Sequence, residues 1–490
     1  MQPYIEYLAH LGSGADAASY GVYPRSIHAC AGGTVYLADD GERDVLVAVG
    51  ADLPFSGETG EAAGRRYCIA QLDHETAEAL RRLLPFTAPV PVLRRDFTVG
   101  VGDRLGIAGR GHIRVFRALG GTPVLAQQSM RELHLTNRTF EDVLDAATFA
   151  VLAEGWHEGF GADGDHLKKP EEIEYALSCG YSMITLDCSE HIRGDIDQMT
   201  DAQAEDAYVP DRERELIYLN RTFHIGETAL TFDRAAFVRM SLIYGGALDF
   251  AAAMYERFFR GNDAVDFEIS IDETATPTTP LQHFFIANEL MRRGVSFATL
   301  APRFCGEFQK GVDYMGDLAQ FEREFAVHEA IAAHFGYKLS VHSGSDKFSV
   351  FPTVGRLTGC RVHVKTAGTN WLEAMRVVAE KDPALYRAVH RYALSMFGEA
   401  KKFYHVTTNI GNIPDVDTLP DAALPALFAN NDARQLIHIT YGFILGAKDE
   451  AGAFLFRDRL YSLWRAARET YYARLEAHIG NHVKKLRGVQ

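Results

Sequence analysis

Polar and charged residues stand at the ends of several short apolar runs of the sequence. They fall in the segments Gly161-Ala-Asp-Gly-Asp-His166, Leu186-Asp-Cys-Ser-Glu190, Glu268-Ile-Ser-Ile-Asp-Glu273, Glu307-Phe-Gln-Lys310, Val341-His-Ser-Gly-Ser-Asp-Lys347 and Val362-His-Val-Lys-Thr366. Burying one charged group costs several kcal/mol unless it is paired or bound to a metal, so packing alone explains such a set poorly. Imidazole, carboxylate and amide oxygen together suit a divalent cation such as Zn²⁺, Mn²⁺, Co²⁺ or Ni²⁺. These segments therefore predict a divalent metal site.

His166 and His342 are the leading candidates for the metal ligands. Each follows a predicted strand and lies in a polar turn that contains glycine. For either histidine alone, an ordinary surface position explains the sequence equally well. Gln309 and Glu307 are nearby oxygen donors, and their positions alone favour neither of them.

The carboxylates at the ends of the third and fifth runs are candidates for acid/base chemistry. Residues i and i+2 of a strand share one face, so Asp163 and Asp165 should point the same way. On the fifth run, Glu268 and Asp272 share a face, and Glu273 lies on the other. This reasoning leaves the choice among the three carboxylates of the fifth run open.

Eight apolar runs, most of them followed by a helix-like stretch, position these groups. The runs are Phe97–Arg104, Pro123–Ser129, Gly159–His166, Ser182–Ser189, Val265–Asp272, Ser296–Arg303, Lys338–Asp346 and Arg361–Gly368. Near-continuous apolar strands separated by helices are typical of a parallel sheet covered on both faces. Eight such units predict an α/β fold, a (β/α)₈ TIM-like barrel, in which side chains at the carboxyl ends of the strands converge on one face.

The rest of the chain surrounds this predicted barrel. We expect residues 1–95 to form a β-rich N-terminal region with a short helix over 73–84, residues 96–370 to form the catalytic barrel, and residues 371–490 to form a C-terminal helical region packed on the barrel. The stretch 190–264 is too long for one crossover and predicts an insertion around Asp195–Asp211, then a helix from Asp233 to about Arg260. In the C-terminal region, helical spacing of apolar residues predicts helices over Asn370–Lys381, Pro383–Phe397 and Phe454–Val489.

Composition restricts the function classes. The 490-residue chain carries a formal net charge of -15, which argues against a nucleic-acid partner. We expect no membrane partner, since no apolar stretch approaches the roughly 18–20 residues that span a bilayer. The N-terminus lacks the pattern of a signal peptide, and the six cysteines form no CxxC pair. We therefore expect reduced thiols and a cytoplasmic location; the oligomeric state stays open.

Five longer motifs resemble the tagaturonate epimerase family. They are Gln127-Gln-Ser-Met-Arg-Glu-Leu133, Gly159-Phe-Gly-Ala-Asp-Gly-Asp-His-Leu-Lys168, Met183-Ile-Thr-Leu-Asp-Cys-Ser-Glu190, Asp272-Glu-Thr-Ala-Thr-Pro-Thr-Thr-Pro280 and Leu339-Ser-Val-His-Ser-Gly-Ser-Asp-Lys347. The resemblance implies a metal-dependent enzyme that interconverts D-tagaturonate and D-fructuronate in hexuronate breakdown. It also implies His166, Gln309 and His342 as metal ligands, and Asp165 and Glu268 as the acid/base pair.

The two sugars differ at a carbinol carbon β to the ketone, which leaves two chemical routes. A base could remove the hydroxyl proton and cleave the adjacent carbon–carbon bond, giving an enediolate and an aldehyde that rotates before re-addition. Alternatively, a proton leaves and returns at carbon from opposite faces. Both routes use two carboxyl groups on opposite sides of the substrate.

The substrate would be a small anionic sugar, and four lysines are candidates to hold its carboxylate: Lys168, Lys310, Lys347 and Lys365. Two other functions fit the same residues. One is a metal-dependent aldolase or lyase on a related sugar keto acid, and the other is a non-catalytic barrel that binds a sugar acid.

Overall fold

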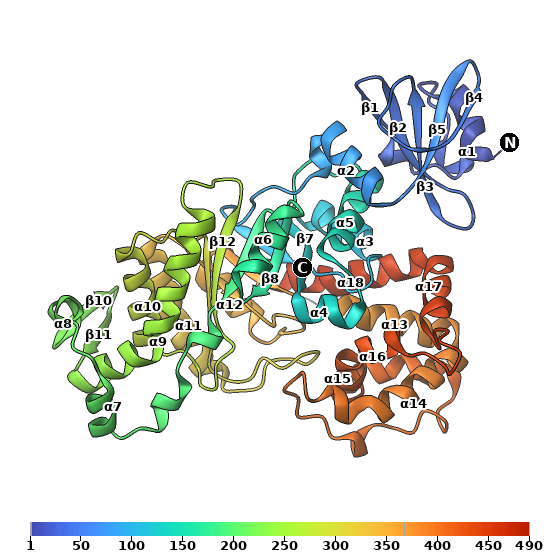
Figure 1. Cartoon of the computed structure of the whole chain (residues 1–490). Coiled ribbons are helices and arrows are strands. Elements are labelled where there is room, and N and C mark those ends of the chain that lie inside the picture. Colours follow the sequence, from blue (N-terminus) through green and yellow to red (C-terminus); the bar gives the residue numbers. More distant parts are fainter. Residues whose placement is uncertain (1, 367, 490) are drawn as a thin grey trace.

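A computed structural model describes residues 2–366 and 368–489 of the chain (Figure 1). Met1, Ala367 and Gln490 lie outside the described residues; they belong to the predicted N-terminal region, eighth run and C-terminal region, respectively.

Eight parallel strands close into a barrel and follow one another around it in chain order. They are β6 (Phe97–Gly100), β7 (Thr122–Ser129), β8 (Gly161–Leu167), β9 (Met183–Asp187), β12 (Asp266–Ile271), β13 (Thr299–Pro302), β14 (Lys338–Val341) and β15 (Val362–Lys365). Each overlaps one of the eight predicted runs, so the predicted barrel is confirmed. All residues of β12 to β15 are buried, as expected of strands packed on both faces.

Helices cover the outside of the barrel. They are α3 (Gly109–Leu119), α5 (Phe140–Glu154), α6 (Pro170–Ser178), α9 (Arg234–Met254), α10 (Pro280–Arg292), α11 (Leu318–Phe335) and α12 (Phe351–Thr358). Helix α5 shows how the sequence sets the ends of a helix. It begins at a capping box of Thr139 and Asp142 and ends at Gly155, which adopts the left-handed conformation.

The last helix of the chain completes the barrel. After β15 the chain enters the C-terminal helices, and it returns as α18 (Arg468–Arg487), which packs against both α3 and α12. A helix from the end of the sequence therefore fills the space between the first and the seventh barrel helices. The predicted helical stretch Phe454–Val489 is divided at Ala467 into α17 (Arg457–Ala466) and α18.

The predicted insertion after β9 projects from one side of the barrel (Figure 1, left). It contains α7 (Asp201–Ala207), α8 (Arg212–Tyr218) and a hairpin of β10 (Arg221–Ile225) and β11 (Thr228–Phe232), so it extends beyond Asp211. The predicted helix after it is α9 with one π-helical turn, Tyr255–Phe259.

The helix Arg234–Phe259 is long and apolar enough to cross a membrane, by length and composition alone. This helix contradicts the sequence expectation that no apolar stretch approaches that length. Its most apolar window is 56% buried, and Phe237 and Leu248 belong to the barrel core. Packing of a core helix accounts for this composition.

An antiparallel sheet in the order β1-β2-β3-β5-β4 forms the N-terminal part of the chain, to one side of the barrel (Figure 1, blue). Its strands are β1 (His28–Cys30), β2 (Gly33–Asp39), β3 (Asp44–Gly50), β4 (Gly57–Ala62) and β5 (Arg65–Gln71), flanked by α1 (Pro3–Glu6) and α2 (His74–Leu83). Both faces of β2 and β3 are covered, and α2 matches the predicted helix.

The C-terminal helices have a hydrophobic core of their own. It contains Trp371 and Trp464, both fully buried. The helices are α13 (Thr369–Lys381), α14 (Pro383–Ala400), α15 (Asn431–Ile439), α16 (Tyr441–Gly446) and α17, and α4 (Met130–Thr136), after β7, packs against α16. The segment 403–409 between α14 and α15 reaches the mouth of the barrel, where Phe403, Tyr404 and His405 line its cavity.

Candidate active site

A cavity of about 580 Å³ opens at the carboxyl ends of the barrel strands. The lining residues near strand ends that could act chemically include Gln127, Arg131, Glu132, Asp165, His166, Asp272, Glu273, Arg303, Glu307, Gln309, Lys310, His342 and Lys365. They follow or end β7, β8, β12, β13, β14 and β15. The barrel thus brings together groups from six strands, as the strand-end argument predicts.

His166 faces this cavity because the end of β8 is irregular. The pairing of β8 with β9 shifts register between Gly164 and Leu167, and His166 has a left-handed backbone with φ 54°. Successive strand residues normally point to opposite faces, whereas such an irregularity re-aims side chains. Asp165 and His166 can therefore both line the cavity.

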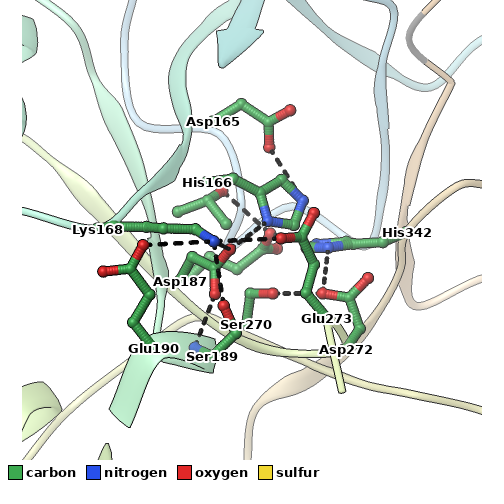
Figure 2. Close-up of polar contacts among 12 residues, drawn as sticks. Asp165, His166, Lys168, Asp187, Ser189, Glu190, Ser270, Asp272, Glu273 and His342 are labelled. Atoms are coloured by element: carbon green, nitrogen blue, oxygen red, sulfur yellow. Dashed lines mark hydrogen bonds and ion pairs between the residues drawn. The ribbon is translucent and has the colours of Figure 1, made fainter. Parts of the chain in front are cut away.

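His166, Asp272 and His342 form the group best suited to hold a metal. One possible ligand atom from each lies within 4.8 Å of the others, and the two histidine rings are 4.9 Å apart. The Asp272 Oδ1 atom is 3.2 Å from His342 Nδ1, and Ser270 donates a hydrogen bond to the same carboxylate (Figure 2). The sequence alone did not distinguish Asp272 from Glu268 and Glu273.

Asp187, at the end of β9, supports His166. Its Oδ2 atom is 3.3 Å from His166 Nδ1, and its Oδ1 atom accepts a hydrogen bond from the Ser189 amide (Figure 2). Sequence reasoning gave Asp187 no role, although its position at a polar strand end was a visible signal. Metal-binding histidines commonly have such a carboxylate partner, which orients the ring.

Gln309 lines the cavity and is buried, but its amide is held from the C-terminal region. Its Oε1 atom accepts hydrogen bonds of 3.0 Å from both the backbone amide and the hydroxyl of Thr407, and one of 3.2 Å from Gln435. Its Nε2 atom has no hydrogen-bond partner within residues 2–366 and 368–489. The prediction that Gln309 binds metal stays a prediction. Glu307 lies farther out, 3.7 Å from His405.

A buried ammonium group joins the predicted acid/base residues. The Nζ atom of Lys365 is 2.8 Å from a carboxylate oxygen of each of Asp163, Asp165 and Glu268. Asp165 lines the cavity. Glu268 has no exposed surface and lies beneath the cavity, where its Oε1 atom is 2.7 Å from His342 Nε2. Of the predicted acid/base pair, Asp165 therefore lies at the cavity surface and Glu268 lies beneath it.

The pairing register explains how Glu268 is held. Thr185 on β9 and Thr299 on β13 stand directly opposite Glu268 in the barrel. Both hydroxyls donate to its carboxylate, at 3.1 Å and 2.5 Å.

The charges of this region are strongly coupled. Burial favours neutral carboxyl groups, yet Lys365 outweighs burial and holds the pKa of Asp165 and of Glu268 below the usual range. Burial, with Asp165 and Glu268, outweighs Lys365 at Asp163 and raises its pKa to about 7. Burial opposes a charged His166, but Asp165 and Asp187 raise its pKa to about 10. Carboxylates dominate the site, so it attracts cations.

Three of the four candidate lysines are already engaged. Lys365 is surrounded by carboxylates, and Lys347 is buried with its Nζ atom donating to the backbone carbonyls of Gln309, Val312 and Ser345. Lys168 is 3.4 Å from Asp187 and is absent from the cavity lining.

Lys310 is the lysine that faces the cavity without a carboxylate partner among the described residues. Its Nζ atom donates to Ser343 Oγ at 3.2 Å, and burial, with the nearby Arg131, lowers its pKa. Arg131 also lines the cavity, forms no ion pair in the described part of the chain, and stacks over the Tyr404 ring at 4.9 Å. Sequence reasoning missed Arg131, although it lies within one of the five motifs.

The closed barrel, with a polar cavity at the carboxyl ends of its strands, defines a (β/α)₈-barrel enzyme. The family model for tagaturonate epimerase matches residues 23–486. The chain belongs to the tagaturonate epimerase family.

Relatives match nearly the whole chain. It is 40% identical over 489 residues to the tagaturonate/fructuronate epimerase of Thermotoga maritima, and this match covers 98% of each of the two chains. A glycerol-complexed crystal structure of the fructuronate-tagaturonate epimerase from Cohnella laeviribosi is 49% identical, with a TM-score of 0.93 over 99% of both chains. The native structure of that enzyme is 48% identical, with a TM-score of 0.93 over 100% of both chains.

Proposed function

We propose that this chain interconverts D-tagaturonate and D-fructuronate in the barrel cavity, with a divalent metal beside His166 and His342. The epimerase activity follows from the family and from relatives that match nearly the whole chain. The observation that carries the location is the group of His166, Asp272 and His342 in a cavity that Lys310 also lines without a carboxylate partner among the described residues.

The donor atoms fit the proposed metal. Two imidazoles and a carboxylate suit Zn²⁺, Mn²⁺, Co²⁺ or Ni²⁺. His166 and His342 would hold the ion, with Gln309 as the ligand implied by family resemblance and Asp272 as a further candidate supported by its distance to His342. When bound, the ion would act as a Lewis acid toward the ketone and hydroxyl oxygens of the sugar.

Asp165 is the proposed base on the cavity side. Lys365 keeps its carboxylate ionised, so it can accept the proton of the substrate hydroxyl or of the epimeric carbon. Glu268 is the proposed second acid/base group and is connected to the cavity through His342. Asp272 and Glu273, which line the cavity directly, are the alternatives for this second role.

Lys310 and Arg131 are proposed to bind the substrate carboxylate. Both line the cavity and neither has a carboxylate partner within the described ranges. A charge-assisted contact contributes roughly 1.5–3 kcal/mol, which is enough to set the orientation of the sugar.

Product analysis tests the activity. Purified protein loaded with each candidate metal is incubated with D-tagaturonate, and the products are separated by chromatography. We expect D-fructuronate with conservation of the carbon skeleton. Two smaller fragments would instead identify a lyase, and binding without turnover would identify a sugar-acid-binding barrel.

The cysteines support a cytoplasmic location. The structure contains six free cysteines, and free thiols suit a reducing compartment. Cell fractionation with compartment markers tests this proposal.

A further inference from the structure

A second cavity, of about 570 Å³, lies between residues 23–25, α3, the end of α5 and α18. Its charged lining residues are Arg25, Arg110, Arg114, Arg117, Glu154 and Glu476. We call it the arginine cavity. It shares no lining residue with the catalytic cavity.

One buried carboxylate, that of Glu154, forms ion pairs with three of these four guanidinium groups. The Oε1 atom of Glu154 is 3.1 Å from the Nε atoms of both Arg110 and Arg114, and its Oε2 atom is 3.2 Å from Arg25. Arg117 forms no ion pair within the described ranges; it donates to the backbone carbonyl of Glu154 at 2.5 Å and lies over the Trp156 ring at 5.8 Å. Glu476 lies at the rim, 3.6 Å from Arg114, and Glu469, just outside the lining, contacts Arg114 at 2.9 Å. Four guanidinium groups therefore face three carboxylates, so positive charge still exceeds negative charge.

Two groups show the effect of this excess. The Nη1 atom of Arg110 is buried and has no hydrogen-bond partner among the residues described. Burial, with the neighbouring Arg25, lowers the pKa of Arg117. A buried guanidinium donor without an acceptor costs free energy, which an anion in the cavity would recover.

The contact of the N-terminal sheet with α17 and α18 is balanced by comparison. There, the two guanidinium groups of Arg465 and Arg468 contact the two carboxylates of Asp39 and Asp44. The lining of the arginine cavity lacks this balance, although the chain as a whole has a net charge of -15.

We propose that the arginine cavity binds a phosphate group, either free or carried by a phosphorylated metabolite. Arg110, Arg114 and Arg117 recur at helical spacing on α3, so they share one face, and Arg25 comes from another segment. Guanidinium forks match phosphate oxygens in pairs, and a dianion can accept donors from several directions at once. A monocarboxylate such as the substrate would use fewer of these donors.

Calorimetric titration of the full chain with inorganic phosphate, at constant ionic strength, tests the proposal. Titration with glucose 6-phosphate in parallel distinguishes free phosphate from a phosphomonoester. We expect saturable binding of at least one of them, and no comparable binding of acetate. Arg110→Gln and Arg117→Gln should each weaken binding about tenfold or more, the scale of one lost charge-assisted contact.

Two further variants locate the site. Arg474→Gln removes the same charge from an exposed position on α18, where Arg474 pairs with Glu380, and should bind phosphate like the wild type. Lys310→Met removes the unpaired lysine of the catalytic cavity and should also retain binding. Circular dichroism verifies that each variant is folded. Absence of phosphate binding, equal binding by all variants, or loss in Lys310→Met alone would overturn the proposal.

Discussion

Two clusters in this protein combine one aspartate with two histidines. The cavity cluster is His166, Asp272 and His342 at the barrel mouth, and the helix cluster is Asp346, His478 and His482, where α18 meets the loop after β14. In both, one possible ligand atom from each residue lies within 4.8 Å of the others. Distance alone therefore does not distinguish them.

The residues that surround each cluster distinguish the two. In the helix cluster, Arg434 contacts Asp346 at 2.6 Å, and His478 contacts the same carboxylate at 2.7 Å. Both ring nitrogens of His482 are used, since Nδ1 donates to the His478 carbonyl at 2.8 Å and Nε2 accepts from the Asp346 amide at 2.9 Å. In the helix cluster, cationic side chains of the protein itself therefore neutralise the Asp346 carboxylate.

The cavity cluster lies in a different environment. Its histidines are next to carboxylates, with Asp187 beside His166 and Glu268 beside His342, and they line an open cavity. Histidines flanked by carboxylates at an open cavity favour a bound metal, whereas a carboxylate neutralised by a buried arginine favours a structural role. We therefore expect metal in the cavity cluster and a stabilising ion-pair network in the helix cluster.

The largest expected effect is on metal content. His166→Ala and His342→Ala should each lose the bound metal and the epimerase activity together, because each removes one proposed ligand. His482→Ala, the matched control from the helix cluster, should keep its metal. Elemental analysis after purification measures this. Full occupancy in both cavity variants would return these histidines to non-ligand roles, and metal loss in His482→Ala would relocate the site.

Asp346→Ala should destabilise the fold by about 3–5 kcal/mol, because it leaves Arg434 buried without its carboxylate. Urea denaturation measures the free energy of unfolding. Asp417→Ala, which removes an exposed ion pair with Arg391, should cost less than about 1 kcal/mol. Similar values for the two variants would contradict a structural role for the helix cluster.

Asp165→Asn and Glu268→Gln should retain the metal but reduce turnover about 10²-fold or more, the usual scale for a positioned acid or base. Both changes preserve shape and remove the ability to accept a proton. Steady-state kinetics with D-tagaturonate, together with metal analysis, test this. If Glu268→Gln keeps near-normal turnover while Asp272→Asn or Glu273→Gln is inactive, the second acid/base group is Asp272 or Glu273 on the cavity wall.

Lys310→Met and Arg131→Met should each raise KM for D-tagaturonate about tenfold, through loss of one charge-assisted contact. Arg474→Met, at an exposed position on α18, is the matched control. The effect on a neutral ketose such as fructose should be much smaller, because it has no carboxylate. If both substrates lose kcat/KM equally, another group binds the carboxylate, and Arg303 is next to test.

The smallest effect is the pH dependence of the helix cluster. Asp346 opposes the effect of burial and raises the pKa of His478, which also faces Glu373 at 3.6 Å. The charged form thus stabilises the fold fully below the unfolded pKa of about 6.5, and this contribution is lost as pH rises through the raised folded value. The stability difference between wild type and His478→Gln should therefore shrink above about pH 6.5. Chemical denaturation from pH 5.5 to 9 measures it, and a constant difference would contradict the ion pair.

The sequence by itself determined the barrel and much of its mouth. Each barrel strand is a local apolar run, and the parallel arrangement follows from alternation with helices, so neither requires knowledge of distant contacts. His166, His342 and Asp165 were found because strand ends in this fold point to one face. The same logic found several equivalent carboxylates and lysines without ranking them.

Only the tertiary structure ranked them, because burial and pairing join residues far apart in the chain. Lys365 meets Asp165 across 200 residues, which removes this lysine from the candidates for substrate binding. Strand register places Glu268 beneath the cavity and Asp272 beside His342. A loop from the C-terminal region holds Gln309, and α18 completes the barrel from the end of the chain. Strand patterns are local, whereas the partner of each buried charge depends on the register and packing of the whole fold.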